Sequence, residues 1–173
     1  MDVSSASPSA SRPVLLATLD VPFAEEATVF AVDAAVESGQ PLVVANVVEV
    51  QPTRWSLVGY GYIENEELQR NLLKPAELAH ALAVQVERLR VCSPHPVDAL
   101  LALVVERDPG VLVFGPEPSG MRRRTYERAS RRIRERTNCL VWTAADPAPE
   151  HAEFARRPEG RRVLPRFISR RRP

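Results

Sequence analysis

The chain has little of what metal-binding, disulfide-stabilised and membrane-spanning proteins need. Only 2 cysteines occur in 173 residues, Cys92 and Cys139. They lack C-x-x-C spacing and have no histidine set nearby, which argues against a zinc site and a disulfide framework. No apolar run approaches the roughly 18 residues of a membrane span, and residues 1–12 are too polar for the core of a signal peptide. We therefore expect a soluble, cytoplasmic protein without a metal site.

Recognisable catalytic motifs are also missing. The three histidines, His80, His95 and His151, share no local motif with a serine or cysteine nucleophile. The segment "LDVPF" does not supply the S-G-G-x-D-S-like loop of related pyrophosphatase-type enzymes, and no aspartate ends the expected third strand as in a phosphoacceptor domain. These absences predict that the protein is not an enzyme.

The net positive charge of the chain comes from its C-terminal tail. The net charge is +1, but residues 155–173 contain eight arginines and one glutamate, a local +7 that leaves residues 1–154 at −6 (1 − 7 = −6). The folded part thus has no overall electrostatic reason to bind nucleic acid. The tail could contact nucleic acid, anionic lipid or an acidic partner, or only solubilise the chain. Because the tail lacks glycine-aromatic repeats, we predict that it does not bind a specific nucleic acid. A single lysine beside 22 arginines suggests a bacterial genome rich in G and C.

The length fits one domain with tails. Residues 1–12 are rich in serine and alanine, without periodicity, and residues 146–173 are rich in proline and arginine. We expect a disordered lead at 1–12, one folded domain at 13–145 and a disordered basic tail at 146–173.

Short apolar runs alternate with helix-like segments along the domain. Helical spacing appears within residues 23–38, 68–89, 97–108 and 125–136, although 97–108 could by period also be a strand. Runs typical of buried strands occupy residues 14–20, 41–50, 89–92, 111–114 and 139–144. This order predicts an α/β fold with an open, mainly parallel five-stranded sheet and helices on both faces.

Prolines and glycines give local predictions within this pattern. Pro22 is placed to open the first helix, and Gly39 to end it. Pro75 predicts either a helix start or a kink.

The loop at residues 51–63 carries Trp55, Tyr60 and Tyr62, which either cover a ligand or shield the end of the sheet.

A ligand site is expected where the first and fourth strands end. Asp20 and Gly115 follow these strands, so they face one crevice if the strands are neighbours. A carboxylate there can accept a hydrogen bond from a ribose or base, and the N–H groups of a glycine loop can hold phosphates. The alternative is that Asp20 only caps a helix and Gly115 only allows a turn.

With the strands placed, residues 13–144 resemble the universal stress protein family. The resemblance rests on "VLLATLDVPFAEEA", "VVANVVEVQP", the "YGY" loop and "DPGVLVFG…GMRRRTYERASRRIRERTNCLVWTA". It implies a Rossmann-like sheet with strand order 3-2-1-4-5, a stress-response role and a homodimer joined through the fifth strand, Cys139 to Ala144. Some members of the family bind ATP and others do not.

The resemblance also implies positions for a nucleotide. Asp20 and Val47 match the residues that address adenosine, and Gly115 matches the first glycine of the phosphate motif G-x-x-G, nine residues, G-S or G-T. The second glycine is replaced by Pro118, and the closing pair falls on Glu127 and Arg128. We therefore predict weak or lost ATP binding.

Other anion-binding groups remain in this stretch. Ser119 and Gly120 could form a small anion-binding turn. Arg122, Arg123 and Arg124 either replace the missing phosphate donors or form a solvated basic face. The alternative functions are an ATP-binding protein with a modified phosphate loop, and an anionic-surface-binding protein that acts through its tail.

Overall fold

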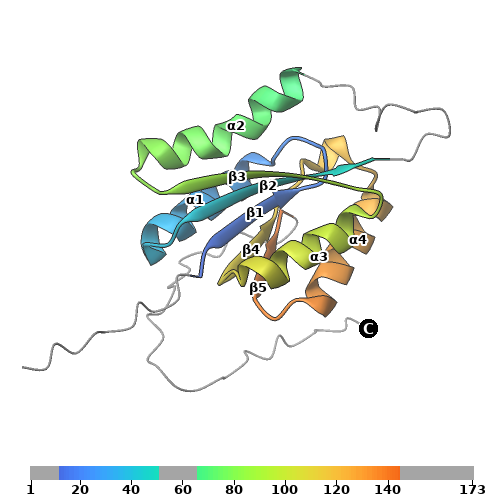
Figure 1. The fold of residues 1–173 in the computed structure, drawn as a ribbon. Coiled ribbons are helices and arrows are strands. Elements are labelled where there is room, and N and C mark those ends of the chain that lie inside the picture. Colours follow the sequence, from blue (N-terminus) through green and yellow to red (C-terminus); the bar gives the residue numbers. More distant parts are fainter. Residues whose placement is uncertain (1–11, 51–65, 145–173) are drawn as a thin grey trace, which may run out of the picture.

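Five parallel strands form the sheet in a computed structural model that describes residues 12–50 and 66–144. Their order is β3-β2-β1-β4-β5 (Figure 1), and every neighbouring pair is parallel. The predicted fold and strand order are confirmed. The strands are β1 (Val14–Thr18), β2 (Leu42–Glu49), β3 (Val86–Ser93), β4 (Val111–Phe114) and β5 (Leu140–Thr143).

Four helices cover the two faces of this sheet. Figure 1 shows α1 and α2 on one face, with α3 and α4 on the other. The helices are α1 (Glu25–Ser38), α2 (Glu66–Ala81), α3 (Pro96–Arg107) and α4 (Arg123–Arg136). The chain thus forms the predicted three layers, and β1, β2 and β4 are mostly apolar because helices bury both of their faces.

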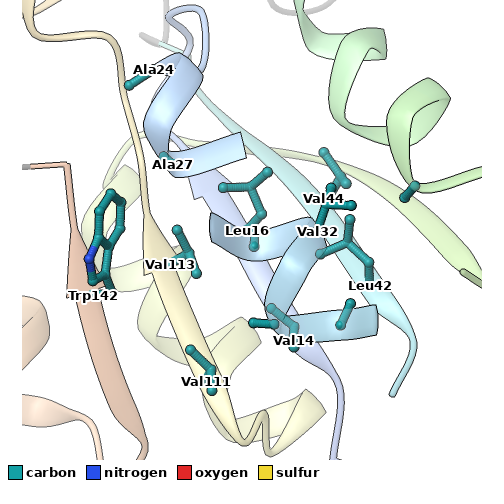
Figure 2. Packing of buried hydrophobic residues seen from close by; sticks show 14 residues of the cluster. Val14, Leu16, Ala24, Ala27, Val32, Leu42, Val44, Val111, Val113 and Trp142 are labelled. Carbon is teal, nitrogen blue, oxygen red and sulfur yellow. The ribbon is translucent and has the colours of Figure 1, made fainter. Parts of the chain in front are cut away.

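Two apolar clusters hold these layers together. The cluster on the face covered by α1 and α2 includes Leu16, Val44 and Val113 from the three central strands (Figure 2). At its β5 edge the ring of Trp142 stacks on Phe30 of α1, with centroids 4.8 Å apart. On the other face, Leu100 of α3 and Ile133 of α4 are completely buried.

The ends of α1 test the predictions made from proline and glycine. Gly39 ends α1 in the left-handed conformation, with φ 64°, as predicted. The prediction for Pro22 is wrong, since α1 begins at Glu25. Pro22 instead lies in the loop before the helix, where its carbonyl accepts a hydrogen bond from the N–H of Glu117.

The third strand differs most from the prediction. Val86 and Leu89 belong to an eight-residue strand, not to a helix, and β3 is not shortened to residues 89–92. The helix before it ends at Ala81, because Ala83 adopts the left-handed conformation with φ 58°. The N–H of Val84 then bonds the carbonyl of Ala79, and the N–H of Ala83 bonds that of His80, which closes the helix end without a glycine.

Other local predictions have mixed outcomes. The prediction of a helix at 97–108 is confirmed by α3. Pro75 does not start a helix, since α2 begins at Glu66 and runs through it. The lead, the aromatic loop with Trp55, Tyr60 and Tyr62, and the basic tail lie outside the described residues. Within the described ranges, no helix combines the length and apolarity needed to cross a membrane.

Candidate functional site

The carboxyl ends of β1 and β4 lie side by side, as the predicted site requires. Leu16 pairs with Val113 and Ala17 with Phe114, so Asp20 and Gly115 follow adjacent strands at one edge of the sheet. We call the segments that follow, residues 19–24 and 115–120, the paired loops.

Asp20 occupies a turn that β2 stabilises. Its backbone is left-handed, with φ 54°, and its N–H donates to Oδ1 of Asn46 at 2.9 Å. Within the same turn, the Thr18 hydroxyl donates to the carbonyl of Val21 at 2.8 Å. The alternative in which Asp20 caps a helix is wrong, because residue Ala24 is the N-cap of α1. Asp20 as a nucleotide contact stays a prediction.

Asn46 was missed by sequence reasoning. It is a buried polar residue within the apolar strand "LVVANVVE", with 6% of its surface exposed. A polar side chain in a strand buried on both faces requires a hydrogen-bond partner. That interruption of the apolar run was the available signal, although the partner, the N–H of Asp20, is visible only in the fold.

Gly115 has a packing role at this edge. A Cβ atom added to it would lie 2.2 Å from Cβ of Ala27, so only glycine permits this approach of α1. Its N–H already donates to the carbonyl of Ala17 at 3.0 Å, and its own carbonyl accepts from the N–H of Ala24 at 2.9 Å. Both backbone groups of Gly115 are thus engaged within the fold.

The rest of the loop from Gly115 to Gly120 offers few backbone donors. Residues 116 and 118 are prolines and have no N–H. The N–H of Glu117 donates to the Pro22 carbonyl at 2.7 Å, and that of Gly120 donates to the Glu117 carbonyl at 3.0 Å. Only the N–H of Ser119 has no backbone partner among the contacts of the described residues. A phosphate cradle built from backbone N–H groups needs several converging donors, and this loop does not present them.

Side chains of the loop add negative charge near this donor. The Ser119 hydroxyl donates to Oε1 of Glu117 at 3.3 Å, so a carboxylate lies beside the expected anion-binding turn. Gly120 packs against Val21, since an added Cβ would lie 3.1 Å from the Val21 Cβ. With the bridge between Phe23 and Pro116, this contact places the two loops directly against each other.

The arginines lie at the start of α4. Arg122 is the N-cap, and no side chain caps the helix. Arg123 forms an ion pair with Glu127, with Nε 2.8 Å from Oε1, while Arg122 and Arg124 are exposed. Glu127 and Arg128, where the closing G-S pair was placed, lie inside α4 and not in the loop.

Val47 lies in β2 with a completely buried side chain. It packs in the cluster beneath α3 and α4, so only its backbone could address a nucleotide base. The structure therefore brings Asp20, Gly115, Ser119 and Gly120 to the paired loops, adds Arg122 at the adjacent helix start, and places the Val47 side chain in the core.

The arrangement offers hydrogen bonding rather than an evident reaction. Across residues 12–50 and 66–144, no three His, Cys, Asp or Glu side chains form a group that could hold a metal ion. Cys92 is exposed on β3, and Cys139 precedes β5. Burial raises the pKa of the Cys139 thiol, which keeps it protonated and weakly nucleophilic at neutral pH.

Comparisons with known proteins agree with this fold. A sequence model of the universal stress protein family matches residues 10–144. Among curated proteins there was no match.

Several solved structures share the arrangement. One is a protein from the universal stress protein family of Burkholderia pseudomallei, with 18% identity and a TM-score of 0.55 over 79% of this chain and 98% of that chain. A universal stress protein in complex with cAMP is 20% identical, with a TM-score of 0.53 over 78% and 97% of the respective chains. The protein from Archaeoglobus fulgidus in complex with dAMP is 17% identical, with a TM-score of 0.55 over 78% and 98%. At such identities, these likenesses show the fold alone.

Proposed function

Because the chain belongs to the universal stress protein family, we propose that it is a non-catalytic stress-response regulator of the cytoplasm whose ATP binding is weak or lost. The observation that carries this proposal is that, between Gly115 and Gly120, only the N–H of Ser119 has no backbone partner among the described residues. Two residues are prolines, and the N–H groups of Gly115, Glu117 and Gly120 are bonded within the fold.

Energetics support a loss of phosphate affinity. To hold a phosphate, the loop has to release internal hydrogen bonds, and each buried group left without a partner costs about 1–3 kcal/mol. Glu117 adds a carboxylate beside Ser119, which repels a phosphate. Both effects weaken the binding of the phosphates. Affinity for adenosine, through Asp20 and the backbone of Val47, should therefore fall less than affinity for a triphosphate.

The alternative is an ATP-binding protein with a modified phosphate loop. It is favoured by the uncapped start of α4 beside the exposed Arg122 and Arg124. An anion at a helix N-terminus is stabilised by the helix dipole, and guanidinium groups can bind phosphate in a bidentate manner. The bound cAMP and dAMP of two structural neighbours make adenine nucleotides the class to test.

Titration calorimetry separates these two functions. The wild-type chain is titrated with Mg-ATP and with AMP, beside Asp20→Ala and the control Asp33→Ala, which removes an exposed carboxylate from α1. We expect Mg-ATP to bind no tighter than millimolar. Micromolar binding of Mg-ATP that Asp20→Ala abolishes and Asp33→Ala retains contradicts the proposal. Chromatography of nucleotide released from the purified, denatured protein gives an independent check.

We further propose a homodimer joined through β5. This strand is at the edge of the sheet and pairs only with β4 in the described part of the chain. Leu140 in it is 51% exposed, and an apolar edge strand is suited to pairing with a second copy. Light scattering should report a dimer that Leu140→Asp dissociates, whereas Leu82→Asp, at a residue 50% exposed beyond α2, leaves it intact. An unchanged mass for Leu140→Asp contradicts this interface.

The basic tail supports a second candidate, binding to an anionic partner. The local +7 of residues 155–173 is its basis, because clustered arginines attract polyanions in a salt-dependent manner. Deletion of these residues should abolish any salt-sensitive retention on DNA or anionic vesicles. Retention that persists in the truncated chain excludes the tail as its cause.

The boundaries 1–12, 13–145 and 146–173 remain predictions that limited proteolysis can test.

A further inference from the structure

A pocket of about 190 Å³ lies between α2 and the strands β2 and β3. We call it the α2 pocket. Apolar side chains form much of its wall, including Phe23 from the loop after β1, and Leu72 and Leu73 from α2. It lies outside the contacts that join the paired loops, although Phe23 borders both.

Asn46, which borders this pocket, has a buried donor without a partner. Its Oδ1 accepts the N–H of Asp20, and only the amide oxygen can accept a bond from a backbone N–H, so the orientation of the amide is determined. Nδ2 is therefore the atom left over. It is buried and has no hydrogen-bond partner within the described structure, and the side chain lines the pocket. Buried donors are normally paired, so Nδ2 calls for an acceptor.

Gln69 supplies a second donor from the opposite wall. Its Nε2 is also buried without a partner in the part of the chain that is described, and it reaches the same pocket from α2. Two residues on different elements that line one pocket thus have buried amide groups with unused hydrogen-bonding capacity.

Arginines make the surroundings positive. Arg88 and Arg90 line the pocket and pair in register with Val44 and Asn46, so their side chains leave β3 on the face that α2 covers. Among the described residues that line the pocket there is no aspartate or glutamate. An acceptor with a negative charge suits this set of donors better than a neutral or cationic group.

We propose that the α2 pocket binds a small apolar carboxylate. The carboxylate accepts from Asn46 Nδ2 and Gln69 Nε2 near the arginines, and the apolar body packs against Phe23, Leu72 and Leu73. The volume sets the size, because an engineered cavity of about 150 Å³ holds one benzene molecule. An aromatic acid with a single ring is therefore near the upper limit. This ligand site goes beyond the proposed function and does not depend on it.

Nuclear magnetic resonance of isotope-labelled, nucleotide-free protein tests the proposal, with benzoate as the probe. The side-chain amide signals of Asn46 and Gln69 are assigned by their loss in Asn46→Asp and Gln69→Glu. We expect both signals to shift with benzoate and to saturate at millimolar concentration. Gln69→Glu removes a donor and adds a like charge on a partly exposed residue of α2, so benzoate should bind about tenfold more weakly or not at all.

Three controls make the outcome decisive. Benzyl alcohol has the ring without the charge, inorganic phosphate has the charge without the ring, and Asn138→Asp repeats the amide-to-carboxylate change at an exposed site outside the pocket. The proposal is supported if benzoate alone gives saturable shifts and Asn138→Asp binds it like the wild type. It is overturned if benzoate leaves both amide signals in place, if phosphate shifts them equally, or if Gln69→Glu binds benzoate unchanged. None of these results alters the Mg-ATP titration.

Discussion

The paired loops and the α2 pocket, two neighbouring regions, treat hydrogen-bond donors in opposite ways. In the loop from Gly115 to Gly120, prolines remove two N–H groups and the fold occupies three others. In the α2 pocket, Nδ2 of Asn46 and Nε2 of Gln69 are buried without partners in the described structure. The backbone donors of the loop expected to bind phosphate are therefore largely bonded within the fold, while two buried side-chain donors without partners belong to residues of the pocket next to it.

Asn46 connects the two regions. Its oxygen stabilises the turn at Asp20, and its nitrogen is buried without a partner in a side chain that borders the pocket. One buried amide thus supports the shape of the first region with its acceptor and leaves its donor to the second. Substitutions that loosen the paired loops test whether their packing and hydrogen bonds matter. Cysteine labelling and a change of charge at Glu117 test the difference between the two regions more finely.

The largest effect is expected from Gly115→Ala. The added Cβ would lie 2.2 Å from the Ala27 Cβ, so α1 must move away from β4, at a cost of about 3 kcal/mol in the free energy of unfolding. Urea denaturation measures this. Gly110→Ala is the matched control, because its nearest atoms lie 3.6 Å away, and it should cost less than about 0.5 kcal/mol. Equal stabilities of the two variants contradict a packing role for Gly115.

A smaller loss is expected from Thr18→Val. This near-isosteric change removes the hydroxyl that bonds the Val21 carbonyl at 2.8 Å, and we expect about 1–2 kcal/mol of destabilisation. In the control Thr28→Val, the Ala24 carbonyl loses the hydroxyl but keeps its bond from the N–H of Thr28. Comparable losses of stability in the two variants contradict a specific role of the Thr18 hydroxyl in the turn.

The two cysteines should differ about tenfold in alkylation rate. Cys92 is exposed on β3, on the α2 side of the sheet, whereas Cys139 is half-buried. Burial raises the pKa of the Cys139 thiol, so less of it is thiolate at a given pH, and its rate should keep rising at pH values above the ordinary range for a thiol. Mass spectrometry after brief labelling measures both sites. A fast reaction that survives in Cys92→Ser contradicts the expected order.

The smallest effect concerns the charge beside Ser119. Glu117→Gln removes the carboxylate near the expected phosphate position, which we expect to improve ATP binding only about twofold to fivefold, since exposed charges contribute about 0.2–1 kcal/mol. Glu37→Gln, an exposed change in the last turn of α1, is the control. An improvement of a hundredfold contradicts the view that missing backbone donors limit binding.

The apolar pattern of the sequence was sufficient to locate strands that are buried on both faces. β4 occupies the predicted residues 111–114, and β2 differs by one residue at each end from the predicted 41–50. Such strands need continuous apolar runs, which are visible without a structure. The pattern failed at β3, where "VERLRVCS" lies at the edge of the sheet and only part of each face is buried. It also failed at Ala83, because an alanine in the left-handed conformation carries no sequence signal.

The sequence predicted where the residues of the candidate site lie in the fold, but not the hydrogen bonds that they make. Asp20 and Gly115 lie at the same end of the sheet because they follow adjacent parallel strands, which strand order alone implies. The use of the Gly115 N–H by Ala17 could not be inferred from the sequence. Nor could the two roles of Asn46, since its partner Asp20 lies 26 residues away.

By itself, the sequence determined the alternation of strands and helices, the parallel sheet, the family resemblance and the charge of the tail. Burial and helical periodicity leave local patterns of apolar residues, so these features can be derived from neighbours along the chain. The tertiary structure decided which donors are free and which glycine permits close packing. Hydrogen bonds and steric contacts join residues that are distant in sequence, as Glu117 joins Pro22 and Gly115 approaches Ala27. Only the folded chain shows that most backbone donors of the loop are bonded internally, whereas two side-chain donors at the neighbouring pocket have no partner in the described structure.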